Sequence, residues 1–272
     1  MAAPITQLDP NQRNGSEQKP KRKPHRGIYL LPNLFTTAAM FAGFYAIVAS
    51  MNGRFEPAAE AIFIAMILDS LDGRIARLTH TQTEFGAQYD SLSDMMCFGI
   101  APALIMYEWS LFGLGKLGWL GCFMYAASVA LRLARFNTQI GVADKRYFQG
   151  LPSPSGAALV IGLIWVGTVW GFRDGKMVAF ASLFITVSAA LLMVSIFRYY
   201  SFKEFDFKGR ITFFSGLLVV LAFVLIAMEH ELMLFLAFFA YALSGPIYTL
   251  RSRRQRRAER KLAAAQKRAG PP

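Results

Sequence analysis

The sequence predicts an all-α fold, a polytopic bundle of transmembrane helices with a polar cavity at its cytoplasmic side. Hydrophobic residues make up 54% of the 272 residues, and charged residues only 17%. Mean hydropathy is +0.36, which places the chain nearer to membrane proteins than to soluble ones. Apolar runs also recur along the chain, and about 20 helical residues are enough to cross a hydrocarbon core. These observations exclude an ordinary soluble domain.

The apolar runs define the elements in order. The first follows a polar leader, and its charge-free length between Arg26 and Arg54 exceeds that of a cleaved signal peptide, so we expect it to remain as an anchor. The second carries Glu60 and further charged residues toward its end, which weakens its hydropathy signal. We expect about eight spans, at 31–51, 57–78, 92–112, 117–135, 156–172, 177–197, 211–228 and 231–250.

Lysine and arginine are distributed unevenly between the two sides. They crowd the leader, the segments 132–147 and 198–210, and the end of the chain from Arg251. The turns on the opposite side hold few basic residues, namely Arg54, Lys116, Arg173 and Lys176. Because cytoplasmic loops carry the excess of positive charge, we expect both termini to be cytoplasmic. Eight spans then place the segment from Asp69 to Asp94 at the cytoplasmic surface as well.

The formal net charge of +12 raises the question of nucleic acid binding. A basic cluster directly after the last span is better explained by topology and by attraction to anionic phospholipid headgroups, worth about 1 kcal/mol per basic residue. We therefore expect membrane lipids, and no nucleic acid, among the partners. Cys97 and Cys122 both fall within expected spans, so they are interpreted as small buried side chains and not as a redox pair.

Four aspartates occur between the apolar segments, where charge is costly and seldom without a function. On a helix, Asp69 and Asp72 are three residues apart and Asp90 and Asp94 are four apart, so each pair projects from one face. Four carboxylates in a poorly solvated site need either protons or hard divalent cations to coexist. We predict a metal site of these four residues that binds Mg²⁺ or Mn²⁺.

Small and basic residues accompany the acids. Gly73 and Ala76 lie on the same helix as the first pair, and Gly86 stands four residues before Asp90. Small side chains let a second helix or a bulky ligand approach the backbone closely. Arg77 lies at the end of its helix, where a guanidinium binds a phosphate with two parallel hydrogen bonds. Together these residues indicate metal-assisted phosphoryl transfer.

Two other interpretations of the acidic cluster stay open at this point. In the first, the aspartates form ion pairs with Arg74, Arg77 or Arg132 and only fix the helices. In the second, they line the ion path of a transporter or channel. The second interpretation leaves the spacing of the glycines, the alanine and Arg77 unexplained.

The complete pattern resembles the signature of the CDP-alcohol phosphatidyltransferase family. It runs Asp69-x2-Asp72-Gly73-x2-Ala76-Arg77-x8-Gly86-x3-Asp90-x3-Asp94, and every fixed position of the signature is matched. Further phrases resemble the phosphatidylserine synthases within this family, and they lie at Phe98 to Pro102, Leu131 to Asn137 and Gly150 to Pro154. The resemblance covers about residues 29–160.

The resemblance implies a role for each matched position. Asp69, Asp72 and Asp90 would coordinate a pair of divalent cations, with Asp94 near the second cation and acting as the general base. The cytidine diphosphate part of a lipid would be held by Asp72, Gly73, Ala76, Arg77 and Gly86. The reaction implied transfers the phosphatidyl group of CDP-diacylglycerol to the hydroxyl of L-serine and releases CMP.

The acceptor is specified less strongly than the family. Other members use glycerol 3-phosphate, inositol phosphate or choline, but the segment from Asp90 to Met95 lacks the D-P-x-A-D-K type of ending found with glycerol 3-phosphate. Arg132, Arg135 and Asn137 lie at the end of the fourth span. They either snorkel to the interface or bind the serine carboxylate or a lipid phosphate. Thr36 in the first span is expected to form a cap or an interhelical bond.

These inferences divide the chain into four segments. We expect a disordered basic leader at 1–28, a catalytic core at 29–160, additional transmembrane helices at 161–250 and a basic cytoplasmic tail at 251–272. The active-site cavity would open to the cytosol from an integral protein of a bacterial inner membrane. The family resemblance also implies a homodimer.

Overall fold

The computed structural model describes residues 30–79, 81–138, 147–172, 175–200 and 229–269. The expected leader at 1–28 and the expected span at 211–228 lie outside these residues. Most of the described chain is helical, and the helical membrane class is confirmed. Four helical segments are long and apolar enough to cross a bilayer, at Leu31–Met51, Lys116–Thr138, Lys176–Val194 and His230–Arg251.

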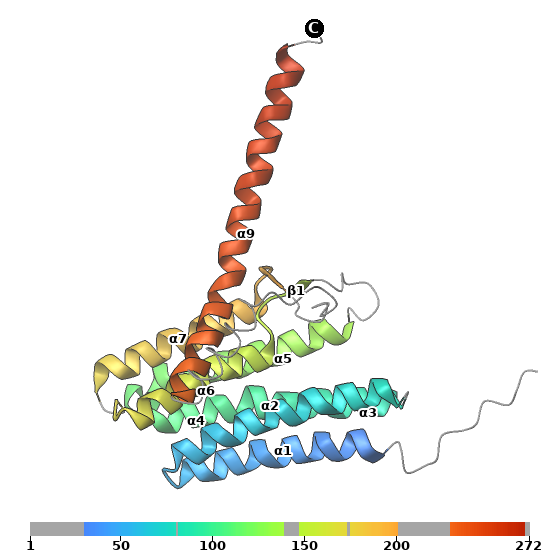
Figure 1. The fold of residues 1–272 in the computed structure, drawn as a ribbon. Coiled ribbons are helices and arrows are strands. Elements are labelled where there is room, and N and C mark those ends of the chain that lie inside the picture. The colour runs from blue at the N-terminus through green and yellow to red at the C-terminus, as the bar shows by residue number, and fades with distance from the viewer. Residues whose placement is uncertain (1–29, 80, 139–146, 173–174, 201–228, 270–272) are drawn as a thin grey trace, which may run out of the picture.

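The helices follow one another in alternating directions (Figure 1). Helices α1 (Leu30–Met51) and α2 (Phe55–Leu78) form an antiparallel pair, joined by a tight turn in which Gly53 has a φ of 71°. The remaining helical elements are α3 (Glu84–Asp94), η2 (Met95–Ile100), α4 (Ala101–Trp109), η3 (Leu111–Leu114), α5 (Lys116–Thr138), α6 (Ser153–Val169), α7 (Lys176–Val194) and α9 (His230–Ala269). As a result, α1, α3 and α6 begin at the end of the bundle where α2, α5 and α7 finish.

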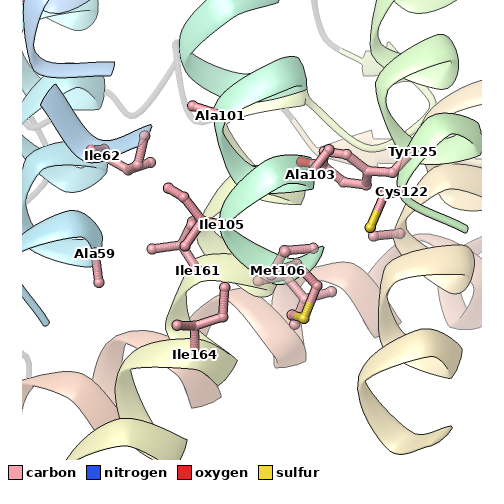
Figure 2. Close-up of a cluster of buried hydrophobic side chains, with 14 of the residues drawn as sticks. Ala59, Ile62, Ala101, Ala103, Ile105, Met106, Cys122, Tyr125, Ile161 and Ile164 are labelled. Atoms are coloured by element: carbon pink, nitrogen blue, oxygen red, sulfur yellow. The ribbon is translucent and has the colours of Figure 1, made fainter. Parts of the chain in front are cut away.

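The core of the bundle is apolar and closely packed. Figure 2 shows Ile62 of α2, Ile105 of α4 and Ile161 of α6 meeting from three helices, and all three are fully buried. On α2 the buried face is mostly alanine, at Ala58, Ala59, Ala61 and Ala65. Small side chains of this kind let membrane helices approach closely. The close packing of α1 and α2 fixes the positions of the polar residues at their common end.

The third expected span is longer than the sequence indicated. We expected it at 92–112, whereas the helix begins at Glu84, where the Thr83 side chain caps it by accepting a hydrogen bond from Gly86 N at 3.0 Å. The residues directly after Asp94 form a π-helical segment, η2. Tyr125 donates a hydrogen bond to the carbonyl of Phe98 within this segment at 3.0 Å. The sequence analysis did not predict this widened turn, which is common at functional sites.

A short antiparallel β pair is a second difference from the expected all-α fold. In the described part of the chain, β1 (Tyr147–Gln149) pairs with β2 (Arg198–Tyr200), with Phe148 opposite Tyr199. Each strand has only three residues, too few for the alternating pattern that would reveal a strand in a sequence. The pair joins the chain before α6 to the chain after α7.

Helix α9 extends the last expected span into the basic tail. It runs for 40 residues to Ala269, so most of the segment at 251–272 is helical. Its first half packs against α6, where Gly162 lies against Phe235, and the remainder projects away from the bundle (Figure 1).

The contact between α1 and η2 depends on a glycine and predicts a measurable change in stability. A Cβ added at Gly43 would lie 2.8 Å from Cys97 Sγ and 3.2 Å from Cys97 Cα. We expect Gly43→Ala to lower the free energy of unfolding by about 1 kcal/mol or more, because overpacking outweighs the gain in helix propensity. Thermal unfolding in detergent measures this. The control is Gly113→Ala, because a Cβ there meets no described atom within 4 Å; equal effects would contradict the packing argument.

Candidate functional site

Asp72 is the most enclosed acid at the common end of the helices. It is only 4% exposed, and Thr36 of α1 donates a hydrogen bond to its Oδ2 at 2.6 Å. A buried carboxylate is tolerated only when it has such partners. The expected interhelical bond of Thr36 is therefore present, and it orients one acid of the site.

Asp69, Asp72 and Asp90 converge at this end. Each offers one carboxylate oxygen to a cluster in which all three oxygens lie within 4.8 Å of one another. Asp69 and Asp72 lie on the last two turns of α2, and Asp90 lies on α3. The spacing of three residues on α2 presents the first two together, and the packing of α3 on α1 brings the third to them.

Asp94 lies beside this cluster, one turn after Asp90 at the end of α3. Its carboxyl is within hydrogen-bonding reach of Asp69 and close to the charges of Asp90 and Arg132. It is not part of the group of three oxygens that lie within 4.8 Å of one another. The structure thus separates the four predicted ligands into a set of three and one neighbour.

The acids lack the partners that a purely structural cluster would have. Among the described residues, no ion pair within 4 Å joins any of the four aspartates to an arginine, and Oδ1 of Asp90 and Oδ1 of Asp94 are buried without a hydrogen-bond partner. The interpretation in which ion pairs with Arg74, Arg77 or Arg132 fix the helices is therefore not supported. Buried carboxylate oxygens without donors are suited to a hard divalent cation.

Asp90 shows what these acids do in the absence of a cation. Burial, together with the charges of Asp69 and Asp72, raises the pKa of Asp90 to about 7. A neighbouring positive charge would reverse this effect, since it favours the ionised carboxylate. The donor set and its unsatisfied oxygens fit Mg²⁺ or Mn²⁺, with Asp69, Asp72 and Asp90 as ligands.

The small and basic residues of the pattern surround the acids. Arg77 is exposed and lies back along α2, with Nη1 at 3.5 Å from the Cβ position of Gly73. Gly86 is in the first turn of α3, where a Cβ would lie 3.1 Å from Thr83 Oγ1 and 3.6 Å from Asn33 of α1. Glycine at these positions leaves open backbone beside the cluster, and the half-buried Ala76 extends this surface.

The three residues predicted near the acceptor have different surroundings. Arg132 Nη1 donates to Ser153 Oγ at 2.7 Å, and Arg132 faces Asp94 electrostatically. Arg135 Nη2 donates to the carbonyl of Val194 at 2.9 Å, which ties α5 to the end of α7. In a third contact, Asn137 Nδ2 donates to Ser91 Oγ on α3 at 3.1 Å. The structure therefore brings only Arg132 of these three next to the aspartates.

Residues 29–194 match the family model described as CDP-alcohol phosphatidyltransferase, which covers more than half of the chain. The chain belongs to the CDP-alcohol phosphatidyltransferase family. Three curated relatives of this transferase carry the name CDP-diacylglycerol–serine O-phosphatidyltransferase. That of Helicobacter pylori (strain ATCC 700392 / 26695) is 35% identical over 216 residues, covering 79% of this chain and 90% of the relative. That of Mycobacterium bovis is 36% identical over 184 residues, covering 65% and 64%. That of Methanocaldococcus jannaschii is 42% identical over 101 residues, covering 37% and 47%.

Some residues that shape the site of the transferase were missed in the sequence analysis. Ser93 Oγ donates to the carbonyl of Thr36 at 3.2 Å, and Cys97 Sγ donates to the carbonyl of Ala39 at 3.2 Å. These bonds join η2 and the end of α3 to α1. Ser93 lies within the D-S-L-S-D phrase, but a serine beside an aspartate gives no sign that it binds a backbone 57 residues away.

Metal binding by the transferase should depend on pH through Asp90. Below pH 7 the cation-free protein holds a proton on this carboxyl, so a cation must displace it. We expect Mn²⁺ affinity to fall by up to about tenfold for each pH unit below 7. Calorimetric titration of the purified protein between pH 5.5 and 8, in buffers of different ionisation enthalpy, measures both the affinity and the proton released.

Two variants separate this effect from a general loss of negative charge. Asp90→Asn should weaken Mn²⁺ binding at pH 8 and flatten its pH dependence. Glu60→Gln removes an exposed acid from α2 outside the cluster and should change neither quantity. An affinity that is the same at pH 5.5 and pH 8 in the unmodified protein would contradict the assignment.

Proposed function

We propose that this chain is a CDP-diacylglycerol–serine O-phosphatidyltransferase. It transfers the phosphatidyl group of CDP-diacylglycerol to the hydroxyl of L-serine and forms phosphatidylserine and CMP. The observation that carries the proposal is the convergence of Asp69, Asp72 and Asp90 at one end of an apolar helical bundle. The relatives of this name, which match most of the chain, support serine as the acceptor.

The donor lipid is held beside the acidic cluster. Asp69, Asp72 and Asp90 hold a pair of divalent cations, with Asp94 near the second. A bound Mg²⁺ or Mn²⁺ pair neutralises the diphosphate and the charge that develops on the leaving group. The face formed by Gly73, Ala76, Arg77 and Gly86 lets the cytidine diphosphate lie against the helix backbone, and the exposed Arg77 guanidinium binds a phosphate.

Asp94 acts as the general base. Its Oδ1 is buried and has no hydrogen-bond partner among the described residues, so it is available to a substrate hydroxyl. Asp94 accepts the proton of the serine hydroxyl as the serine oxygen bonds to the phosphorus that carries diacylglycerol. The bond from that phosphorus to the bridging oxygen breaks, and CMP leaves with the electron pair.

Arg132 binds the anionic part of the acceptor. It lies between Asp94 and the start of α6, and its Nε is buried without a hydrogen-bond partner in the described part of the chain. A guanidinium at this distance from the base suits the serine carboxylate, since it binds a carboxylate with two parallel hydrogen bonds. Arg135 and Asn137 contribute by fixing the end of α5 against α7 and α3.

The site faces the cytoplasm of a bacterial cell, in the inner membrane, and both termini lie on the same side. The excess of basic residues at the end of the bundle that carries the acids supports this orientation. The basic tail contacts anionic phospholipids and not nucleic acid, and the protein forms a homodimer through its lipid-facing helices. The segments at 29–160 and 161–250 serve as catalytic core and additional transmembrane helices.

Removal of the proposed base tests the mechanism. Asp94→Asn should lower serine-dependent CMP release by about 10²- to 10⁴-fold, the usual contribution of general base catalysis. Because Asp94 is not among the three converging ligands, the variant should keep most of its Mn²⁺ affinity and its binding of CDP-diacylglycerol. Turnover within a few-fold of the unmodified enzyme would remove Asp94 as the base.

A choice of acceptors tests the substrate assignment. Purified protein is incubated with CDP-diacylglycerol, Mn²⁺ and, separately, L-serine, glycerol 3-phosphate, inositol phosphate and choline, and the lipid products are identified by mass spectrometry. We expect phosphatidylserine with serine and little product otherwise, and no product after thorough chelation by EDTA. Product from a different alcohol would refute serine as the acceptor while leaving the family assignment intact.

A further inference from the structure

Ser153, outside the acidic pattern, contacts the proposed acceptor residue directly. It is 1% exposed, and its Oγ accepts the hydrogen bond from Arg132 Nη1 at 2.7 Å. The bond links residues that are 21 positions apart in the sequence. A hydrogen bond from a charged donor in a buried position holds a side chain more firmly than one between neutral groups.

The bond to Ser153 uses one corner of the guanidinium and leaves the opposite edge available. A guanidinium binds carboxylates in parallel through the edge formed by Nε and Nη2, which lies away from Nη1. Arg132 Nε is buried and has no hydrogen-bond partner among the described residues. An unsatisfied buried donor of this kind indicates a missing ligand.

Ser153 is itself held by an unusual backbone. Gly150, three residues earlier, has a φ of 77°, which glycine adopts without strain. Its N–H donates to the carbonyl of Phe197 at 2.9 Å, and the N–H of Leu151 donates to the carbonyl of Leu192 at 3.0 Å. Together with the β pair, these bonds fasten the start of α6 to the end of α7.

The C-terminal helix closes this arrangement. Tyr199 of β2 is fully buried and donates to the carbonyl of Ala242 on α9 at 2.9 Å. A Cβ at Gly245 would collide with the Tyr199 ring, so glycine is needed for the close approach of β2 to α9. Helix α9 lies outside residues 29–194 and thus outside the matched family model. It nevertheless packs against the strand that fixes Ser153.

We infer that Ser153 is a positioning residue for the acceptor: its hydroxyl holds the Arg132 guanidinium so that the free edge binds the carboxylate of a small hydroxy acid next to Asp94. The inference rests on the proposed role of Arg132 in acceptor binding. It also assigns a purpose to the phrase from Gly150 to Pro154, which the acidic cluster leaves unexplained.

Steady-state kinetics of Ser153→Ala test the inference. We expect the KM for serine to rise by about tenfold or more, the usual effect of losing a hydrogen bond to a charged group. The KM for CDP-diacylglycerol and the affinity for Mn²⁺ should change less than twofold. Ser153→Thr keeps the hydroxyl and should restore most of the serine affinity. The matched control is Ser182→Ala, which removes an equally buried hydroxyl of α7 and should leave both KM values unchanged.

A double-mutant cycle shows whether Ser153 acts through Arg132. Adding Ser153→Ala to Arg132→Ala should raise the KM for serine no further than Arg132→Ala alone. Additive effects, or equal increases in the KM values of both substrates, would overturn the inference. The cycle and the threonine rescue stay informative even if Ser153→Ala lowers thermal stability, since a structural defect alone would not discriminate between the two substrates.

The outcomes distinguish this inference from the proposed function. If the unmodified protein uses serine and Ser153→Ala has no effect on its KM, only the inference fails. If the unmodified protein uses a different anionic acceptor, serine is refuted, and the effect of Ser153→Ala on the KM of that acceptor decides the inference. If the acceptor carries no anionic group, both proposals fail.

Discussion

The repulsion among carboxylates at the end of an apolar bundle is the constraint on which the rest of the structure depends. Asp69, Asp72 and Asp90 present oxygens within 4.8 Å of one another in a region that water reaches poorly. Such a group is tolerated only with donors, protons or cations. Thr36 supplies one donor to Asp72, while oxygens of Asp90 and Asp94 stay unsatisfied in the described structure. The remaining demand is what makes the site suitable for divalent cations.

The helices that carry these acids are held by small residues and by buried side chains that bind backbone. Alanines on α2 and Gly43 on α1 allow close packing, and Ser93 and Cys97 join the third helix to α1. The π-helical turn after Asp94 lies at this junction. Because α1 contacts both acidic helices, its position determines the distance between the two pairs of aspartates.

The other wall of the site depends on the later part of the chain. Arg132 and Arg135 both lie on α5, and each bonds to a different neighbour: Arg132 to the start of α6, and Arg135 to the end of α7. The β pair joins those two ends, and Tyr199 fastens the pair to α9. The acids that hold the donor and the arginine proposed for the acceptor are thus supported by separate sets of helices.

The sequence by itself determined the helical membrane class, the acidic pattern and the family. These follow from local properties, since the spacing of Asp69 and Asp72 fixes a shared helix face without reference to any other helix. Tertiary structure decided which acids converge, that Arg132 and not Arg135 lies next to Asp94, and that Ser153 holds Arg132. Contacts of this kind join residues far apart in the chain. They depend on how closely helices pack, which neither the hydropathy nor the spacing of a segment records.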